Sequence, residues 1–326
     1  MTALNFGKSR IVKGHALSLG VRLLAARGVP QAVVKVLSYG HGTPGVKASM
    51  KYISKDGELP LETESGDIVI GSVEQKELVK NWSRDFGTRK NSRDSVHLTF
   101  SMPKGSDPEA LRGAVRTVLS KKFPGHESVF AIHEDRPHPH AHVVVKMRSR
   151  ESGKQLRINR PEIQQLREAF AEAATEQGVE LAASPRAARG VGQKGTSQAV
   201  HHLRKRGIVP RVDKVMAQEV MDDLERGGWR EKVWEQAQRE RNEQERKAYL
   251  KEAQRVRAEA ALKKPAHDPR TQQALIKAAA DLARYSEEMP EPKTRRQTMM
   301  EKFAKQFGIR NPQETQRQNR DTGMER

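Results

Sequence analysis

The stretch SVFAIHEDRPHPHAHVVVKM, residues 128–147, decides how we expect this chain to fold. Its two ends, SVFAIH and HAHVVVKM, are short apolar runs separated by a polar connection with two prolines, a pattern that predicts two β-strands joined as an antiparallel hairpin. Side chains two positions apart on a strand point to the same face, so His140 and His142 should share a face. Hairpin pairing should then bring His133 beside them. The stretch predicts a sheet that gathers histidines at one end of a hairpin.

These histidines are candidate metal ligands. Three neutral imidazoles, from His133, His140 and His142, would leave the charge of a divalent ion in place, which suits polarising a phosphate oxygen. Asp135 could orient one imidazole or take up a proton. A surface tract with incidental metal affinity is the alternative for the H-x-H pair alone, but the spacing of His133 and Asp135 favours a built site. His138 stays open as ligand, DNA contact or neither. Imidazole suits Zn, Ni, Cu and Fe, whereas Mg and Mn prefer oxygen, so the ligands do not select the metal.

Composition points to a polyanionic partner. The 326 residues carry 60 Lys and Arg against 41 Asp and Glu, a net charge of +19 with a pI near 10.1. Such an excess favours nucleic acid through counterion release. With no cysteine in the sequence, thiolate metal sites, disulfides and a cysteine nucleophile are excluded. No apolar run approaches the roughly 20 residues that span a membrane, and the low mean hydropathy of −0.80 suggests that part of the chain is not packed.

The pattern of elements divides the chain. We expect an N-terminal extension over 1–30, a domain of interleaved strands and helices over 31–210, and a helical, charged region over 211–326 whose polar end is disordered. The segment LETESGD is expected to be a polar loop. Lysine and arginine interrupt the apolar N-terminal stretch IVKGHALSLGVRLLAARG and no cleavage site follows, so we interpret it as part of an intracellular protein rather than a signal peptide. The predicted strands cover 31–38, 95–103, 128–133 and 140–147, and the predicted helices cover 44–55, 74–86, 107–123 and 160–178.

A covalent nucleophile for phosphodiester chemistry would have to be Tyr, Ser, Thr or His. Among the four tyrosines, Tyr52 lies in MKYISKDG, where Lys51 and Lys55 could hold a phosphate and favour a phenolate. A helical tyrosine beside Met50 and Ile53 is more often a core residue, so a structural role is the alternative.

The segment GHGTPG, residues 40–45, matches the dinucleotide-binding pattern G-x-G-x-x-G. No second strand ending in an acid follows about 20 residues later, as that fold requires. We therefore favour a loop that leads into a helix, with a dinucleotide-binding protein as the weaker alternative.

Together these segments resemble the relaxases of conjugative and mobilisable plasmids, most closely the T-DNA border endonuclease branch, over roughly residues 30–200. MKYISKDG is similar to the motif that carries the family's catalytic tyrosine, which implies Tyr52. HLTFSMPKGSD is similar to the strand and turn before the metal motif. HEDRPHPHAHVVV is similar to the histidine motif, which implies His133, His140 and His142 as metal ligands with Asp135 as their partner.

Two further features complete the resemblance. GVELAASPRAARG is similar to the segment that follows in the family, which implies Arg186 and Arg189 as phosphate contacts. The family often has asparagine where this chain has Lys146. This difference implies that one polar contact of the family is not conserved in this chain, but it does not affect the three histidines. Rolling-circle replication initiators share the histidine motif, but their tyrosine follows it, whereas Tyr52 precedes His133 here.

The resemblance implies an α+β fold, an antiparallel sheet with flanking helices of the HUH endonuclease kind, followed by a largely helical charged region. It implies that Tyr52 nicks one strand of single-stranded DNA at a transfer origin, stays on the 5′ end and later rejoins the strand. The implied cofactor is a divalent metal, Mg or Mn before Zn. Implied partners are accessory DNA-binding proteins, a coupling protein and a type IV secretion system, although the helical region fits a solvated spacer equally well. The implied location is the bacterial cytoplasm, with export alongside DNA into a recipient.

Two other functions are also compatible with this sequence. One is a non-catalytic basic nucleic-acid-binding protein whose histidine cluster is structural, and the other is a rolling-circle replication initiator. Covalent capture of DNA separates the binding protein from the enzyme, because a binding module would show salt-sensitive affinity without cleavage.

Overall fold

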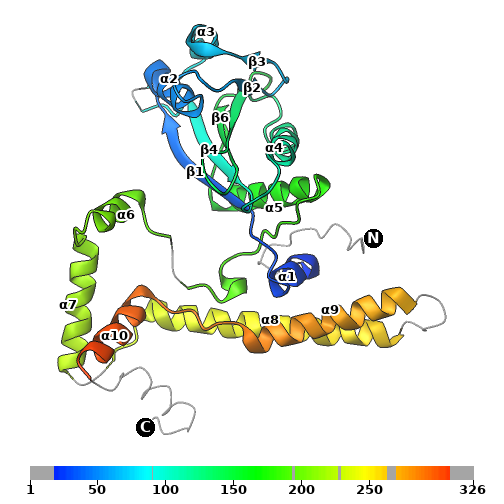
Figure 1. Ribbon diagram of the computed structural model, residues 1–326, viewed down its shortest axis with the longest axis vertical. Coiled ribbons are helices and arrows are strands. Elements are labelled where there is room, and N and C mark those ends of the chain that lie inside the picture. Colours follow the sequence, from blue (N-terminus) through cyan, green and yellow to red (C-terminus); the bar gives the residue numbers. More distant parts are fainter. Residues whose placement is uncertain (1–17, 90, 193–194, 227–228, 263–268, 309–326) are drawn as a thin grey trace. The chain divides into compact units, whose positions relative to one another are not determined.

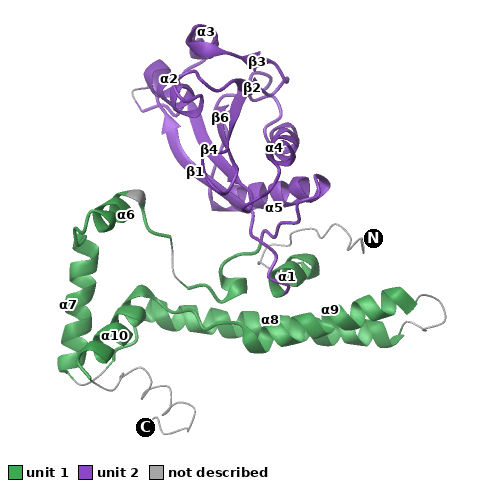
Figure 2. Cartoon of the chain, viewed as in Figure 1, with its two compact units in different colours: residues 1–26, 184–326 green, residues 27–183 purple. Residues whose placement is uncertain are grey.

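The computed structural model describes residues 18–89, 91–192, 195–226, 229–262 and 269–308 (Figure 1). The chain forms two compact units, coloured separately in Figure 2. One unit spans Arg27–Ala183 and contains the sheet. The other combines the segment before residue 27 with the chain from residue 184 onward.

The first unit is built on a six-stranded sheet in the order β1-β4-β6-β5-β2-β3, and its strand pairs are antiparallel. This confirms the predicted antiparallel sheet with flanking helices, and each of the four predicted strands is present. The strands are β1 (Val33–Gly40), β2 (Leu61–Thr63), β3 (Ile68–Val69), β4 (Ser95–Ser101), β5 (Ser128–His133) and β6 (His140–Lys146).

Strand β6 lies at the centre of the sheet, between β4 and β5, and each of its residues is buried. Alternation sends Ala141, Val143 and Val145 to one face, while His140 and His142 go to the other. Because both faces of the sheet are covered, three consecutive valines can all be buried, and polar residues need not alternate with apolar ones along this strand.

Helices α4 (Pro108–Lys122) and α5 (Arg160–Glu176) cover the first face, as Figure 1 shows. Asp107 caps α4 by accepting from the backbone N–H of Glu109, with proline in the first turn. A reciprocal capping box between Asn159 and Glu162 starts α5. These signals made both helices predictable from the sequence.

Helices α2 (Gly42–Ile53) and α3 (Gly71–Ser83) cover the opposite face, on which the histidines lie. Val46, Met50 and Ile53 of α2 are fully buried against Val144 of β6. The packing of these residues fixes the C-terminal end of α2 over the histidine end of the hairpin.

The prediction that LETESGD is a polar loop was wrong. Its first residues form β2, which pairs with β5, and a tight turn leads into β3. Leu61 is fully buried, and the Glu62 carboxylate is 2% exposed between the guanidinium groups of Arg112 and Arg116 on α4. A glutamate paired with two arginines of a distant helix can occupy a strand interior, and no local sequence signal shows this.

The second unit is largely helical, which confirms the predicted helical C-terminal region. A long antiparallel pair, α8 (Val233–Leu262) and α9 (Pro269–Glu288), packs through Tyr249, Val256 and Leu282, and α1 (Leu19–Ala26) joins this core. Part of the predicted N-terminal extension is therefore a helix of this unit. The remaining elements are η1 (Ala187–Arg189), α6 (Gln198–Lys205), α7 (Arg211–Glu225) and α10 (Arg295–Gln306).

The domain boundaries predicted from the sequence stay a prediction, and the predicted disordered end lies outside the described residues. Among the helices that the structure describes, none is both long and apolar enough to cross a membrane.

Candidate metal centre

The hairpin brings together the three histidines predicted to bind metal. His133 and His140 lie directly opposite each other in the β5–β6 pairing, and His142 is two positions further along β6. Each of the three offers a ring nitrogen, and these nitrogens lie within 4.8 Å of one another. The rings are buried, with 5%, 8% and 5% of their residue surface exposed. The predicted hairpin and its convergence of three imidazoles are confirmed.

The second ring nitrogen of each histidine has its own neighbour. His133 donates from Nε2 to the backbone oxygen of Ile53 at 2.7 Å, and His140 donates from Nδ1 to the backbone oxygen of His138 at 3.2 Å, because a carbonyl only accepts. His142 Nδ1 lies 2.9 Å from Nε2 of His97. If His142 is the donor there, one nitrogen of each imidazole keeps its lone pair for a metal. The donor set therefore fits a divalent ion.

Electrostatics favours neutral rings. Burial is the main cause that lowers the pKa of His142 to about 3 and of His97 to about 4, with neighbouring histidines adding to both shifts. Burial also lowers the pKa of His140. Neutral imidazole is the form that coordinates metal, so the environment favours the ligand form near neutral pH.

Tyr52 lies over the same site from α2. It is 58% exposed, although its neighbours Met50 and Ile53 are fully buried, so it is not a core residue. Its ring meets those of His142 and His97 edge-on, with centroid distances of 5.4 and 5.8 Å. An accessible phenol therefore lies beside three convergent imidazoles.

Asp135 lies in the exposed connection of the hairpin. Its carboxylate is 4.0 Å from Nε2 of His140, beyond hydrogen-bond distance, and 3.4 Å from Nζ of Lys55. Partial burial opposes ionisation, but the hydrogen bond and charge of Lys55, with His133 and His140, hold the pKa of Asp135 below its usual value. The imidazoles are oriented by other groups, namely two backbone carbonyls and His97.

The predicted DNA-contacting residues fall into two groups. Lys51 pairs with Asp56 at 2.9 Å and Lys55 pairs with Asp135. Lys51 lies in the last turn of α2, and Lys55 lies in the turn that follows the helix. Arg186 precedes η1 and Arg189 is the last residue of η1, so both belong to the second unit, whereas the histidines belong to the first.

Lys146, which stands where the resembling family often has asparagine, lies away from the histidine site. It is 2% exposed and pairs with Asp85 at 2.8 Å and Glu127 at 2.6 Å, so it stabilises the end of β6.

The segment GHGTPG does not form a dinucleotide-binding loop. The Gly42 N–H donates to the Asp94 carboxylate at 2.7 Å. An acid therefore occupies the position that a dinucleotide phosphate would take, and the antiparallel sheet also disagrees with that alternative.

Sequence reasoning missed His97 as a site residue. It lies on β4 opposite Val144, diagonal to His142, and is 5% exposed. The alternation in HLTFS places His97, Thr99 and Ser101 on one face, so the sequence carried a signal. Only the β4–β6 register shows that this face also holds the candidate metal ligands.

Comparison with known families supports this geometry. Residues 52–179, from Tyr52 through the hairpin to the end of α5, match the family model of the relaxase nuclease domain, MobA/VirD2-like. This part of the chain is similar to the nuclease domain of relaxases. The matched segment contains both Tyr52 and the three histidines.

Individual relatives agree with this assignment. The chain is 27% identical over 213 residues to the T-DNA border endonuclease VirD2 of Rhizobium radiobacter, covering 58% of this chain and 48% of that protein. It is 28% identical over 199 residues to VirD2 of Agrobacterium fabrum, covering 54% of this chain and 44% of that protein. The chain therefore spans less than half the length of these relatives.

Among solved structures, the chain is similar to the relaxase domain of MobM bound to oriT DNA of plasmid pMV158, in Mn-bound crystal structures. The TM-scores are 0.37 and 0.38 with 12% identity, and the matches cover 53% and 54% of this chain and 98% and 99% of that domain.

Proposed function

We propose that this relaxase nicks one DNA strand at a transfer origin by transesterification, with Tyr52 as nucleophile. The observation that carries the proposal is the position of Tyr52, exposed and edge-on to His142, beside three buried imidazoles whose ring nitrogens lie within 4.8 Å. The relatedness to T-DNA border endonucleases supports the same activity.

The proposed ligands of a divalent ion are His133, His140 and His142. Such an ion would supply positive charge to an oxygen of the scissile phosphate. The carbonyl of Ile53 orients the first ring, because it accepts from His133 at 2.7 Å. Since Ile53 follows Tyr52 in α2, this hydrogen bond also ties the nucleophile's helix to the ligand. His97 would orient His142, which the sequence alone did not predict.

The proposed reaction exchanges one phosphodiester bond for another. The Tyr52 oxygen forms a bond to phosphorus while the bond from phosphorus to the 3′ oxygen breaks, and the phenolic proton is released as the 3′ oxygen gains one. The strand keeps its phosphate on Tyr52 at the 5′ end. A 3′-hydroxyl can reverse the reaction and rejoin the strand, so no nucleotide hydrolysis is needed.

Asp135 and the basic residues would assist binding. With a lowered pKa and Lys55 at 3.4 Å, Asp135 would remain charged and hold Lys55 at the edge of the site. Lys51, Arg186 and Arg189 are proposed phosphate contacts on the single strand. Accessory DNA-binding proteins, a coupling protein and a type IV secretion system are proposed partners, and the proposed location is the bacterial cytoplasm with export to a recipient.

Covalent capture tests the proposal. The full chain is incubated with labelled single-stranded oligonucleotides carrying candidate origins, with Mn or Mg and separately with chelator, and is then run on a denaturing gel. We expect metal-dependent label on the protein that is lost in Tyr52→Phe and retained in the matched control Tyr285→Phe, which changes a tyrosine of α9.

Label that persists in Tyr52→Phe would assign the nucleophile elsewhere. Binding without covalent label, on oligonucleotides that include the element's own origin, would contradict the enzyme and leave a non-catalytic nucleic-acid-binding protein. Mn or Mg is expected to support the reaction, and comparison with Zn identifies the preferred ion.

A further inference from the structure

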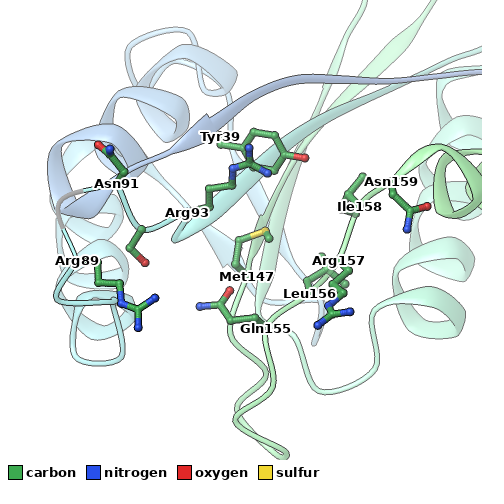
Figure 3. A pocket seen from close by; sticks show the side chains of 11 residues that line it. Tyr39, Arg89, Asn91, Arg93, Met147, Gln155, Leu156, Arg157, Ile158 and Asn159 are labelled. Carbon is green, nitrogen blue, oxygen red and sulfur yellow. The ribbon is translucent and has the colours of Figure 1, made fainter.

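A basic pocket, whose lining Figure 3 shows, lies in the unit Arg27–Ala183. It is at the end of β4 and β6 that is opposite to His133 and His140. Its volume of about 600 Å³ is within the range of small-ligand sites. It lies between two loops, one before β4 and one between β6 and α5. The lining residues are Tyr39, Arg89, Asn91, Ser92, Arg93, Met147, Gln155, Leu156, Arg157, Ile158 and Asn159.

The loop before β4 is held by a buried carboxylate. Asp94 is 3% exposed, and its Oδ1 accepts from the N–H of Gly87 at 2.9 Å and from the hydroxyl of Ser92 at 3.0 Å. Its Oδ2 accepts from the N–H of Gly42 at 2.7 Å. These bonds anchor the part of the rim that carries Arg93.

The loop after β6 is anchored independently. The N–H of Leu156 donates to the backbone oxygen of Met147 at 2.7 Å, which closes the turn between them. Asn159, at the end of this rim, caps α5. Both rims are therefore held by hydrogen bonds to regular elements, so the pocket is largely formed before a ligand enters.

The charge of the pocket suits an anion. Arg89, Arg93 and Arg157 line it, and among the described residues that do so none is acidic. The structure shows no acidic partner for any of these arginines within its described residues. Figure 3 shows Arg89 and Arg157 on the two opposite rims. A phosphate between the rims could meet guanidinium groups from both sides.

The remaining surface suits a flat ring. The guanidinium of Arg93 lies 4.2 Å from the centroid of the Tyr39 ring, and the two are side by side in Figure 3. Met147, Leu156 and Ile158 add apolar surface, and three side-chain amides stand at the margin. Bases stack on aromatic rings and on arginine planes, and amides can bond to base edges. Charge and shape together match one nucleotide.

We propose that this pocket binds one unpaired nucleotide of the DNA strand, away from the scissile phosphate. The inference rests on the proposed function for the identity of the strand. Five strand positions separate His142 from Met147, or about 17 Å along the strand at about 3.4 Å per residue, and the apolar residues of the pocket belong to the opposite face of the sheet from the histidines. At about 3.4 Å per stacked nucleotide, the bound base would lie on the order of five nucleotides or more from the nick. Such a contact would fix the register of the strand at the metal centre.

The test measures binding separately from cleavage. Full-length chain carrying Tyr52→Phe is titrated by fluorescence anisotropy against a labelled oligothymidylate of about 30 nucleotides, at several salt concentrations. Tyr39→Leu removes the proposed stacking contact with the base, and Arg157→Gln removes a proposed contact with the phosphate. Arg150→Gln is the matched control, because Arg150 is exposed and does not line the pocket.

We expect Tyr39→Leu to weaken binding roughly tenfold with an unchanged salt slope, the effect of losing one stacked base. Arg157→Gln should weaken binding several-fold and reduce the salt slope by about 0.7, the effect of losing one phosphate contact. Thermal melts by circular dichroism establish that each variant is folded, and the exposed position of Arg157 protects that variant from loss of fold.

The proposal is overturned if both folded variants bind the oligonucleotide as Arg150→Gln does. Thymidine monophosphate serves as a competitor, and if it occupied the pocket at micromolar concentration without affecting oligonucleotide binding, the site would belong to free nucleotides. Covalent capture by the chain with Tyr52 intact tests the activity separately. Loss of affinity in the variants without any adduct would contradict the proposed activity alone, whereas an adduct with unaffected variants would contradict the pocket alone.

Discussion

At the scale of single residues, the histidine centre contains a fourth imidazole, that of His97, which contacts one of the three proposed ligands. Its Nε2 lies 2.9 Å from His142 Nδ1, so it can fix both the tautomer and the ring plane of a proposed ligand. We expect His97→Ala to weaken Mn binding about 10- to 100-fold, as measured by isothermal titration calorimetry, because removal of such a partner leaves the ligand unoriented.

The matched control for this prediction is His126→Ala. His126 is a partly buried histidine that bonds the backbone oxygen of Lys146, far from the three ligands along β6. It should bind Mn as the parent does. Equal affinities for the parent and His97→Ala would assign His97 a packing role only.

The lowered pKa values of these histidines predict a pH dependence of folding. In the folded chain the pKa of His97 is about 4 and that of His142 about 3, mainly because of burial, against an ordinary value of 6.5. The unfolded chain therefore binds more protons between these values, so this stability is present above pH 6.5 and is lost as the pH falls toward 4. We expect the metal-free protein to melt at a lower temperature at about pH 5 than at about pH 7.

The double variant His97→Gln/His142→Gln isolates this contribution from other titrating groups. Calorimetry should show a smaller loss of melting temperature over the same pH range. If the melting temperatures of the parent and the double variant fell by the same amount over this pH range, the buried histidines would not cause the pH dependence of stability.

At the scale of elements, the end of β6 depends on a buried lysine. Lys146 is 2% exposed, its ammonium contacts Asp85 and Glu127, and its hydrogen bond lowers the pKa of Asp85. Because the carboxylates of Asp85 and Glu127 are 51% and 20% exposed, water can solvate them when the lysine is removed, which reduces the loss of stability. We expect Lys146→Ala to lower the free energy of unfolding by about 2 to 3 kcal/mol in urea denaturation.

Lys154→Ala is the control for this variant, since Lys154 is an exposed lysine of the following turn and should change stability by less than about 0.5 kcal/mol. Metal affinity should stay unchanged in Lys146→Ala, because Lys146 and His140 lie at opposite ends of β6. A large loss of metal binding would contradict the separation of the strand end from the histidine site.

At the scale of the whole molecule, each unit has its own hydrophobic cores. Two cores line the faces of the sheet in Arg27–Ala183, and two others join the helices of the second unit. We expect two calorimetric transitions, because separate cores can unfold separately. Mn at about 100 times its dissociation constant should stabilise only the transition of the unit Arg27–Ala183, by about 2.7 kcal/mol.

The chain with His140→Ala and His142→Ala identifies the transition that metal affects. In that variant neither transition should respond to Mn. A shift of both transitions in the parent would show that the two units unfold together.

The sequence by itself determined the main strands, the helices of the sheet unit and the central hairpin. Apolar alternation, helix caps and the two prolines of the connection are local signals, and they act within a few residues. The hairpin also placed His133 opposite His140, because two neighbouring strands share one register. For the same reason the convergence of the three histidines was predictable from the sequence.

Tertiary structure alone decided what meets the hairpin from elsewhere in the chain. Packing of Met50 and Ile53 leaves Tyr52 exposed against His142, the β4–β6 register places His97 beside the same ring, and arginines of α4 hold Glu62 within β2. These partners are separated by tens of residues, so their contact depends on how helices and strands pack. A local pattern in the sequence does not contain that information.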